Sequence, residues 1–193
     1  MSSASNPKRI QIMATGKELF WKFGFKRVTI EEICREAGVS KMTFYKFFPN
    51  KQVLATNILD AVFEESLVKI RNIADEHETA DNTLRKFLQL KSEGVNGISK
   101  EFIKDLYENP DGEMGLYIEK KSRIIFSEII NVYENGKKDG WVRKDLNVPF
   151  FLQFTQKTIE LVSKDELLNH FESSEELIME ISNLFVYGIS PHR

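Results

Sequence analysis

The sequence predicts an all-α fold, on three observations. Apolar residues recur at three- and four-residue steps along most of the 193 residues, which is the period of one helix face. No segment alternates apolar and polar residues between hairpin turns, as a strand would. Glycines and prolines fall between the periodic segments, where helices end. These breaks are Gly24, Gly38, Gly94, Gly97, Pro110, Gly112, Gly136, Gly140 and Pro149.

The first helix is expected over about residues 12–23, because apolar residues share one face there. That face holds Ile12, Gly16, Leu19, Phe20 and Phe23. Gly24 can end the helix, since glycine adopts the left-handed conformation without steric cost.

The next two helices are predicted to be short. Thr29 and Glu32 have capping-box spacing, in which each side chain bonds the backbone N–H of the other residue. A helix over 30–37 is therefore expected, ended by Gly38. Ser40 can cap a second helix over 41–47. Two short helices joined by a three-residue turn with a glycine form a helix-turn-helix.

Longer helices are expected in the rest of the chain. Asn50 can cap the first of them, which starts at Lys51. The periodic segments run over about 51–78, 81–93, 98–109, 112–136, 148–163 and 174–189.

The second short helix is predicted to have two unlike faces. At 100° per residue one side carries Phe44, Phe47 and Phe48. The opposite side carries Lys41, Met42, Thr43, Tyr45 and Lys46. Such a face suits the DNA major groove, where lysine donates to guanine or phosphate and methyl groups contact thymine. The alternative is an ordinary amphipathic helix pair whose lysines are only solvated.

Charge is unevenly divided along the chain. Residues 1–51 contain ten Lys/Arg and four Asp/Glu, a net +6, which leaves −8 for the rest because the total is −2. A basic segment joined to an acidic remainder favours a nucleic-acid-binding head.

Several other classes of protein are not indicated. Cys34 is the only cysteine, so no intramolecular disulfide can form. No apolar run approaches the roughly 18 residues of a membrane span, and the N-terminus lacks a signal core, so a cytoplasmic location is expected. The three histidines share no metal-ligand spacing, and no Walker loop, dinucleotide fingerprint or G-x-S-x-G motif is present. We therefore expect no cofactor, no metal and no enzymatic activity.

The stretch FGFKRVTIEEICREAGVSKMTFYKFFPNKQVL resembles the DNA-binding region of tetracycline-repressor-type (TetR-family) transcriptional regulators. The matching residues are Gly24-Phe25, Thr29, Ala37-Gly38-Val39-Ser40, Thr43-Phe44-Tyr45 and Phe48-Pro49-Asn50-Lys51. The match covers about residues 10 to 55. Met42 and Cys34 depart from the family pattern, where glycine and alanine are usual. Cys34 is interpreted as a small core residue, with a redox switch as the alternative.

The resemblance implies a three-helix DNA-binding domain over 1–50 and a larger helical domain for ligand binding and dimerisation over 51–193. It implies phosphate contacts from Thr29, Ser40, Thr43, Tyr45 and Lys51. It implies base-edge contacts from Lys41, Met42 and Lys46. Phe47 is left open between a DNA contact and the core.

A dimer is expected because one recognition helix reads too few base pairs for useful specificity, whereas two helices ~34–36 Å apart read a pseudo-palindrome. The last helix has apolar residues on more than one side, which indicates a second partner, and the resemblance implies dimerisation through the last two helices. The predicted interface residues are Phe151, Phe154, Leu177, Ile181, Leu184 and Phe185. The alternative is an ordinary buried helix.

The middle of the chain is rich in aromatic residues, and the resemblance implies that this region encloses a pocket for a small-molecule effector. The candidate lining residues are Phe63, Phe87, Phe102, Tyr107, Tyr117 and Phe126; simple packing is the alternative for most of them. The sequence thus predicts a homodimeric DNA-binding regulator, a repressor by family habit, that a ligand releases. A helical protein-interaction module without sequence-specific DNA binding is the alternative function.

Overall fold

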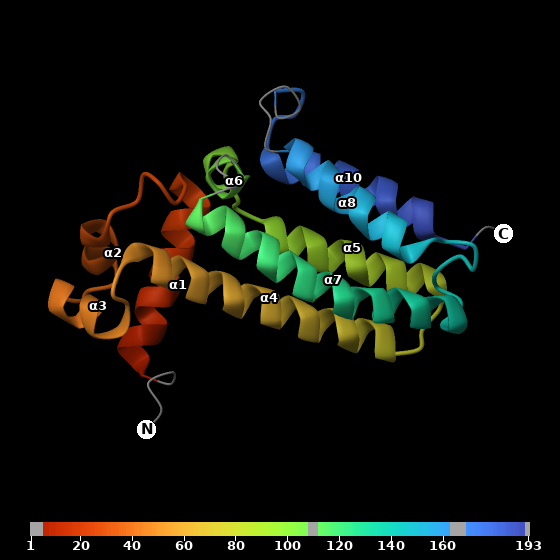
Figure 1. Ribbon diagram of the computed structural model, residues 1–193, viewed down its shortest axis with the longest axis horizontal. Coiled ribbons are helices and arrows are strands. Elements are labelled where there is room, and N and C mark those ends of the chain that lie inside the picture. The colour runs from red at the N-terminus through yellow and green to blue at the C-terminus, as the bar shows by residue number, and fades with distance from the viewer. Residues whose placement is uncertain (1–5, 108–111, 163–168, 192–193) are drawn as a thin grey trace. The chain divides into compact units, whose positions relative to one another are not determined.

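The computed structural model describes residues 6–107, 112–162 and 169–191. Within these ranges every regular element is a helix (Figure 1), so the prediction of an all-α fold is confirmed. The helices are α1 (Pro7–Phe23), α2 (Ile30–Glu36), α3 (Lys41–Phe47), α4 (Lys51–Asp75), α5 (Ala80–Val95), α6 (Lys100–Tyr107), α7 (Glu113–Asp139), α8 (Val148–Val162) and α10 (Ser174–Ile189).

Several helix ends differ from the sequence prediction. Gly94 and Gly136, predicted as breaks, lie inside α5 and α7, which continue to Val95 and Asp139. Two further differences have a local reason. α1 begins at Pro7 because the Asn6 side chain caps it and proline at the first position loses no hydrogen bond. α4 ends at Asp75, before the predicted residue 78, and His77 just beyond it has a left-handed φ of 49° that no helix continues through.

The chain forms two compact units. The first takes in the residues up to Phe63 together with Gly97–Tyr117, and the second takes in Glu64–Asn96 and the residues from Ile118 onward. α4 and α7 each contribute to both units. The first unit therefore contains α6 and the start of α4 in addition to the three N-terminal helices. No helix in the described ranges is both long and apolar enough to cross a membrane.

In the first unit, α1 packs against α2, α3 and α6. Its core is centred on side chains with at most 1 % exposure, namely Ile12, Phe20, Val28, Ile33, Ala37, Phe44, Phe48 and Leu54. A Cβ at Gly16 of α1 would lie 3.1 Å from side-chain carbons of both Leu54 and Ile58, so the glycine lets α4 pack closely.

In the second unit, α10 lies beside α5 and α8 (Figure 1). Its core joins the connection between α7 and α8 to the end of α10, through buried Trp141, Val142, Leu146, Val148, Leu152 and Ile189. The Arg143 backbone N–H donates to the Ile189 carbonyl at 2.9 Å, which ties that connection to the last turn of α10.

Candidate nucleic-acid interface

The start of α2 has the predicted capping box. The Glu32 N–H donates to Thr29 Oγ1 at 3.2 Å, and the Thr29 N–H donates to Glu32 Oε2 at 3.2 Å. Both bonds satisfy backbone donors that a helix start leaves unpaired. Thr29 itself remains exposed.

The turn between α2 and α3 depends on Gly38, which has a φ of 60° and so ends α2 as predicted. The Val39 N–H then donates to the Cys34 carbonyl at 2.9 Å. Cys34 is buried in the core of the first unit, and burial and the neighbouring Glu31 charge raise the pKa of its thiol. A protonated, buried thiol fits the interpretation of Cys34 as a small core residue.

Ser40 caps α3 by accepting the Thr43 N–H at 3.1 Å, as predicted. The inward side of α3 is aromatic: Phe44 is 0 % exposed, and Phe48, just past the helix end, is 1 % exposed. Phe47 is half-buried, which decides neither for the DNA contact nor for the core position that the sequence left open. This side anchors α3 against α1 and α2.

The opposite side of α3 faces outward. Met42 is 84 % exposed and Tyr45 is 52 % exposed, and Lys46 is exposed as well. Thr43 is half-buried, and its hydroxyl lies 3.0 Å from the Ser40 hydroxyl. An exposed methionine beside lysine and tyrosine on a rigidly anchored helix is a surface that can enter a groove.

Lys41 also lies on this surface, where its ammonium pairs with the Glu31 carboxylate of α2. The hydrogen bond between them lowers the pKa of Glu31 and raises the pKa of Lys41, so both stay charged at neutral pH. A carboxylate therefore lies beside a lysine that was predicted to contact a base edge, which no spacing in the sequence indicates. Exposed pairs of this kind are weak and readily exchanged for another partner.

Lys51 is placed differently from the other predicted DNA contacts. Its ammonium donates to the carbonyls of Phe25 at 2.7 Å, Lys26 at 3.2 Å and Val28 at 2.8 Å. A lysine ammonium has three hydrogens, so these acceptors occupy all of them. Lys51 thus organises the chain before α2, and its predicted phosphate contact stays a prediction.

A shallow cleft lies next to the exposed face of α3, where the start of α1 approaches it. It is lined by Asn6, Pro7, Lys8, Thr43, Lys46 and Phe47. Asn6 and Lys8 were missed by the sequence analysis. Asn6 followed by Pro7 is a helix-start signal that could have placed them at the beginning of α1.

Part of the positive charge of the head is held over aromatic rings. Arg9 lies 5.3 Å from the Phe48 ring centroid, and Arg27 lies 4.4 Å from that of Phe23. Lys17 similarly lies over Trp21. Such contacts are weakly attractive and orient these cations. Fewer basic side chains of residues 1–51 are therefore free to reorient toward a partner than their net charge of +6 suggests.

Comparison with known proteins agrees with this geometry. Residues 12–58, which span α1 to the start of α4, match the family model described as "Bacterial regulatory proteins, tetR family". Residues 12–58 thus form a TetR-type domain, the DNA-binding part of TetR-family transcriptional regulators. The sequence-based identification as a TetR-family regulator is therefore confirmed.

Two relatives and one solved structure illustrate the similarity. YuxN of Bacillus subtilis, an uncharacterised helix-turn-helix regulator, is 29 % identical over 84 residues, which are 44 % of this chain and 29 % of YuxN. YhgD of the same organism is 29 % identical over 143 residues, 68 % of this chain and 70 % of YhgD. The fatty acid degradation regulator FadR of Bacillus halodurans shares the fold with a TM-score of 0.70 at 17 % identity, covering 95 % of this chain and 97 % of that one.

These similar proteins are named as regulators, YuxN and YhgD as helix-turn-helix transcriptional regulators. Within the described ranges, no group of three or more His, Cys, Asp or Glu side chains is arranged to hold a metal ion.

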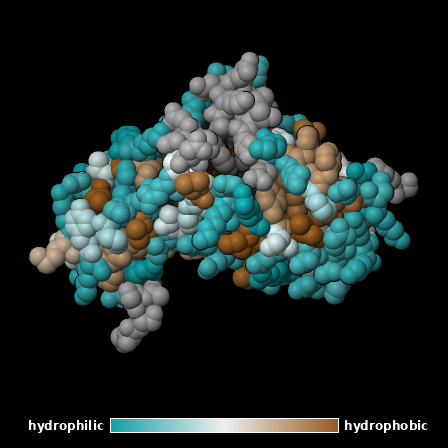
Figure 2. Space-filling view, viewed as in Figure 1, coloured by the Kyte–Doolittle hydropathy of each residue, from teal (hydrophilic) through white to brown (hydrophobic). Residues whose placement is uncertain are grey.

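Five of the six predicted interface residues line one groove between α8 and α10. Phe154 is 54 % exposed and Leu184 is 65 % exposed, whereas Phe151, Ile181 and Phe185 are half-buried. Leu177 is only 3 % exposed and packs inside its own chain. Figure 2 shows hydrophobic residues at the surface over α8 and α10.

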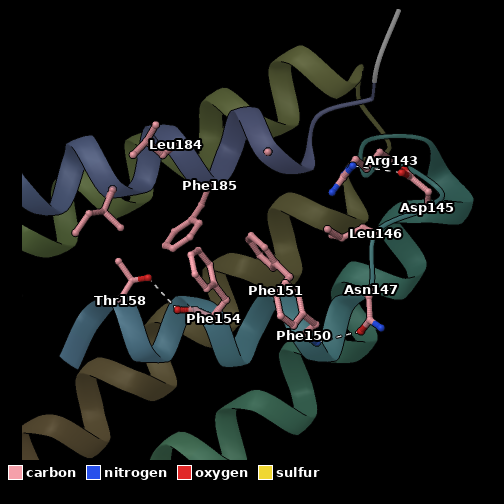
Figure 3. Close-up of a pocket in the computed structure, with 12 residues that line it drawn as sticks. Arg143, Asp145, Leu146, Asn147, Phe150, Phe151, Phe154, Thr158, Leu184 and Phe185 are labelled. Carbon is pink, nitrogen blue, oxygen red and sulfur yellow. Dashed lines mark hydrogen bonds and ion pairs between the residues drawn. The ribbon is translucent and has the colours of Figure 1, made fainter. Parts of the chain in front are cut away.

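A groove of about 520 Å³ runs between these two helices. Figure 3 shows the rings of Phe151 and Phe154 of α8 toward Phe185 of α10, with Phe150 further along α8. Phe185 lies edge-on to both Phe151 and Phe154, with ring centroids 5.5 and 6.0 Å away. Arg143, Asp145 and Asn147 form the polar end of the groove. Phe150, which is 66 % exposed, also lines the groove but is not among the six predicted interface residues.

The structure divides the predicted effector-pocket residues between two cores. Phe63, Phe102 and Tyr117 belong to the core of the first unit, whereas Phe87 and Phe126 pack on the core of the second. The side chain of Tyr107 lies outside the described residues. The Tyr117 hydroxyl donates to Asp60 Oδ1 at 2.7 Å. All five described aromatics are packing residues of their units, and their predicted contact with a ligand stays a prediction.

Proposed function

We propose that this protein is a cytoplasmic, homodimeric repressor. It binds a pseudo-palindromic DNA operator and is released from it by a small-molecule effector. In this proposal residues 1–50 form the DNA-binding domain, and residues 51–193 bind the effector and dimerise. The single observation that carries it is the exposed outer face of α3, with Met42 84 % exposed on a helix whose opposite side is anchored by fully buried Phe44.

DNA contacts are assigned by the chemistry of that face. Met42 and Lys46 reach base edges, the methionine against thymine methyls and the lysine toward guanine. Thr29 and Ser40 lie at the starts of α2 and α3, where unpaired N–H groups favour phosphate. Thr43 and Tyr45 donate hydroxyls to phosphate, and Lys41 exchanges Glu31 for a DNA acceptor.

The exposed apolar groove between α8 and α10 supports the dimer. Burying one exposed leucine or phenylalanine side chain contributes about 1.5–3 kcal/mol, and Phe150, Phe154 and Leu184 are each more than half exposed. A two-fold axis passing near these helices would bury the set twice. That the protein represses transcription, and that an effector releases it from DNA, rest on the family resemblance. To release DNA, the effector must bind the conformation that cannot bind DNA more tightly than the one that can.

The test is selection of duplexes from a random pool by the full-length protein, followed by a titration in salt. Enrichment of a two-fold symmetric site is expected, with affinity falling about 10³–10⁵-fold between 50 and 200 mM salt if six to ten phosphates are contacted. No enrichment together with a flat salt response would overturn the proposal and favour an interaction module.

Lys46→Ala separates base reading from phosphate contact within this test. It should weaken binding to the enriched site by about 1–3 kcal/mol and relax preference at one position. Lys120→Ala, an exposed lysine of α7, is the matched control and should change nothing. Equal losses on enriched and random duplexes would assign Lys46 to phosphate instead. Native mass spectrometry of freshly purified protein tests for a retained effector.

A further inference from the structure

The segment 24–28 joins α1 to α2 and ends directly before Thr29, the cap of α2. We name it the head loop. Because Thr29 is proposed to contact phosphate, the position of the head loop fixes where that contact can form. Two charged side chains from distant parts of the sequence hold this loop, and one of them comes from α6.

Asp105 of α6 accepts a hydrogen bond from the Lys26 backbone N–H, with 2.8 Å between the nitrogen and Oδ2. Its other oxygen lies 3.9 Å from the Lys26 ammonium. The Asp105 side chain is only 11 % exposed, so this carboxylate is largely shielded from water. A hydrogen bond from a backbone amide to a shielded carboxylate is stronger than one between neutral groups.

The approach of α6 to the head loop is close. A Cβ at Gly24, whose φ is 83°, would lie 2.7 Å from Asp105 Oδ2 and 3.2 Å from the Glu101 Cβ. The Ser99 N–H donates to the Trp21 carbonyl at 2.8 Å, and the Trp21 and Phe102 rings lie 4.4 Å apart. α6 is therefore docked on the end of α1 at several points, and Asp105 extends that docking to the loop.

Lys51 holds the same loop through the opposite backbone groups. Its ammonium bonds three carbonyls, those of Phe25, Lys26 and Val28, and lies 4.6 Å from the Phe25 ring centroid. Burial lowers the pKa of Lys51, while the Asp105 charge opposes that shift. A carboxylate on the amide and an ammonium on the carbonyls leave the head loop little freedom.

We propose that Asp105 is a positioning residue for DNA binding: by holding the Lys26 amide it fixes the head loop and thereby the place of Thr29 at the phosphate backbone. Asp105 touches no DNA in this scheme and acts only through the loop. The inference rests on the proposed DNA-binding function. It assigns a role in that function to a residue of α6, 79 positions from its partner.

The test compares Asp105→Ala, Asp105→Asn and Glu101→Ala in the full chain. Glu101 is an exposed carboxylate one turn away on α6, so it controls for the charge. The probes are the duplex that the wild-type protein enriches and a random duplex pool. Backbone hydrogen exchange at residues 24–29 and the thermal midpoint are measured on the same samples.

Asp105→Ala is expected to weaken binding to the enriched duplex about tenfold, the scale of one lost charge-assisted hydrogen bond. The direction is diagnostic, because removing a negative charge near DNA should by itself strengthen binding. Asp105→Asn keeps an acceptor oxygen and should lose at most about threefold. The salt slope should not change, since no phosphate contact is removed, and Glu101→Ala should bind as tightly as the wild type or slightly better.

Binding by Asp105→Ala that equals or exceeds that of Glu101→Ala would overturn the proposal. If Asp105→Ala does not fold, Asp105→Asn decides, because a weaker acceptor must speed hydrogen exchange at the Lys26 amide; unchanged exchange there would refute the role. If the wild-type protein enriches no duplex, the proposed function fails, while the exchange measurement still reports whether Asp105 orders the head loop.

Discussion

Glu31 and Lys41 form an ion pair across the helix-turn-helix, joining the first turn of α2 to the first residue of α3. Both side chains are more than half exposed, so the pair adds little to stability. The pair instead changes the electrostatic potential at the exposed face of α3. A carboxylate within a Debye length of DNA phosphates repels them.

Glu31→Gln should therefore strengthen binding to random duplex DNA at low salt and steepen the salt dependence by up to about one unit of slope. The gain in affinity should be smaller for the enriched site, because there Lys41 is proposed to leave Glu31 for a DNA acceptor. The ratio of affinities for the enriched site and random DNA should therefore fall. Glu36→Gln is the matched control: Glu36 also sits on α2 but pairs with Arg35 instead. If both variants change the slope equally, only net charge matters and the pair has no local role.

Leu184→Glu should convert the proposed dimer to monomers without unfolding the chain. Leu184 is 65 % exposed on α10, so the charge costs the monomer little, but it would be buried without a partner in the proposed interface. Sedimentation velocity measures the mass. Leu116→Glu, at a 55 % exposed leucine of α7, is the control and should remain dimeric. An unchanged dimer mass for Leu184→Glu would place the interface elsewhere.

Gly136→Ala should destabilise the second unit by about 1–3 kcal/mol, the usual cost of overpacking. A Cβ there would lie 2.5 Å from two ring carbons of Trp141 and 2.8 Å from Val142 Cγ2. Gly94→Ala in α5 meets nothing within 4 Å and should instead stabilise by about 0.5–1 kcal/mol, because alanine loses less entropy in a helix. Urea unfolding of both variants measures the difference, and equal effects would show that Trp141 does not pack on Gly136.

Alkaline unfolding should depend on Tyr133. Burial raises the pKa of Tyr133 to about 12, whereas an unfolded tyrosine titrates near 10. Below pH 10 the phenol is protonated in both states; between pH 10 and 12 only the unfolded chain ionises, so stability is lost over that window. The loss amounts to about 3 kcal/mol by pH 12.

Tyr133→Phe should remove this part of the pH dependence, as urea titrations at a series of pH values from 9 to 11.5 would show. Tyr45→Phe, at a 52 % exposed tyrosine of α3, should follow the wild-type curve. Parallel curves for the wild-type protein and Tyr133→Phe would mean that water reaches the Tyr133 phenol.

Local signals predicted the helix-turn-helix well because its parts lie close together in sequence. The Thr29 and Ser40 caps, the turn at Gly38 and the inward Phe44 were each expected from spacing alone and are observed. Capping and turn geometry involve residues within about four positions of each other, so the sequence expresses them directly.

The predicted effector pocket shows where such reasoning ends. Aromatic residues at helical spacing indicate burial but not which core they enter, and Phe102 and Phe87 enter different cores. Likewise, a lysine after a cap indicated a phosphate contact, yet the Lys51 ammonium lies on three carbonyls that are 23 to 26 positions away.

The sequence by itself determined which segments are helical, the caps of α2 and α3, the anchored and exposed sides of α3 and the family resemblance, since each follows from neighbouring residues. The tertiary structure alone decided that Asp105 of α6 holds the Lys26 amide, that Glu31 pairs with Lys41, and that rings from α8 and α10 form one open groove. Those contacts depend on how helices pack. Packing is a property of whole side-chain surfaces meeting in space, which no local spacing rule encodes.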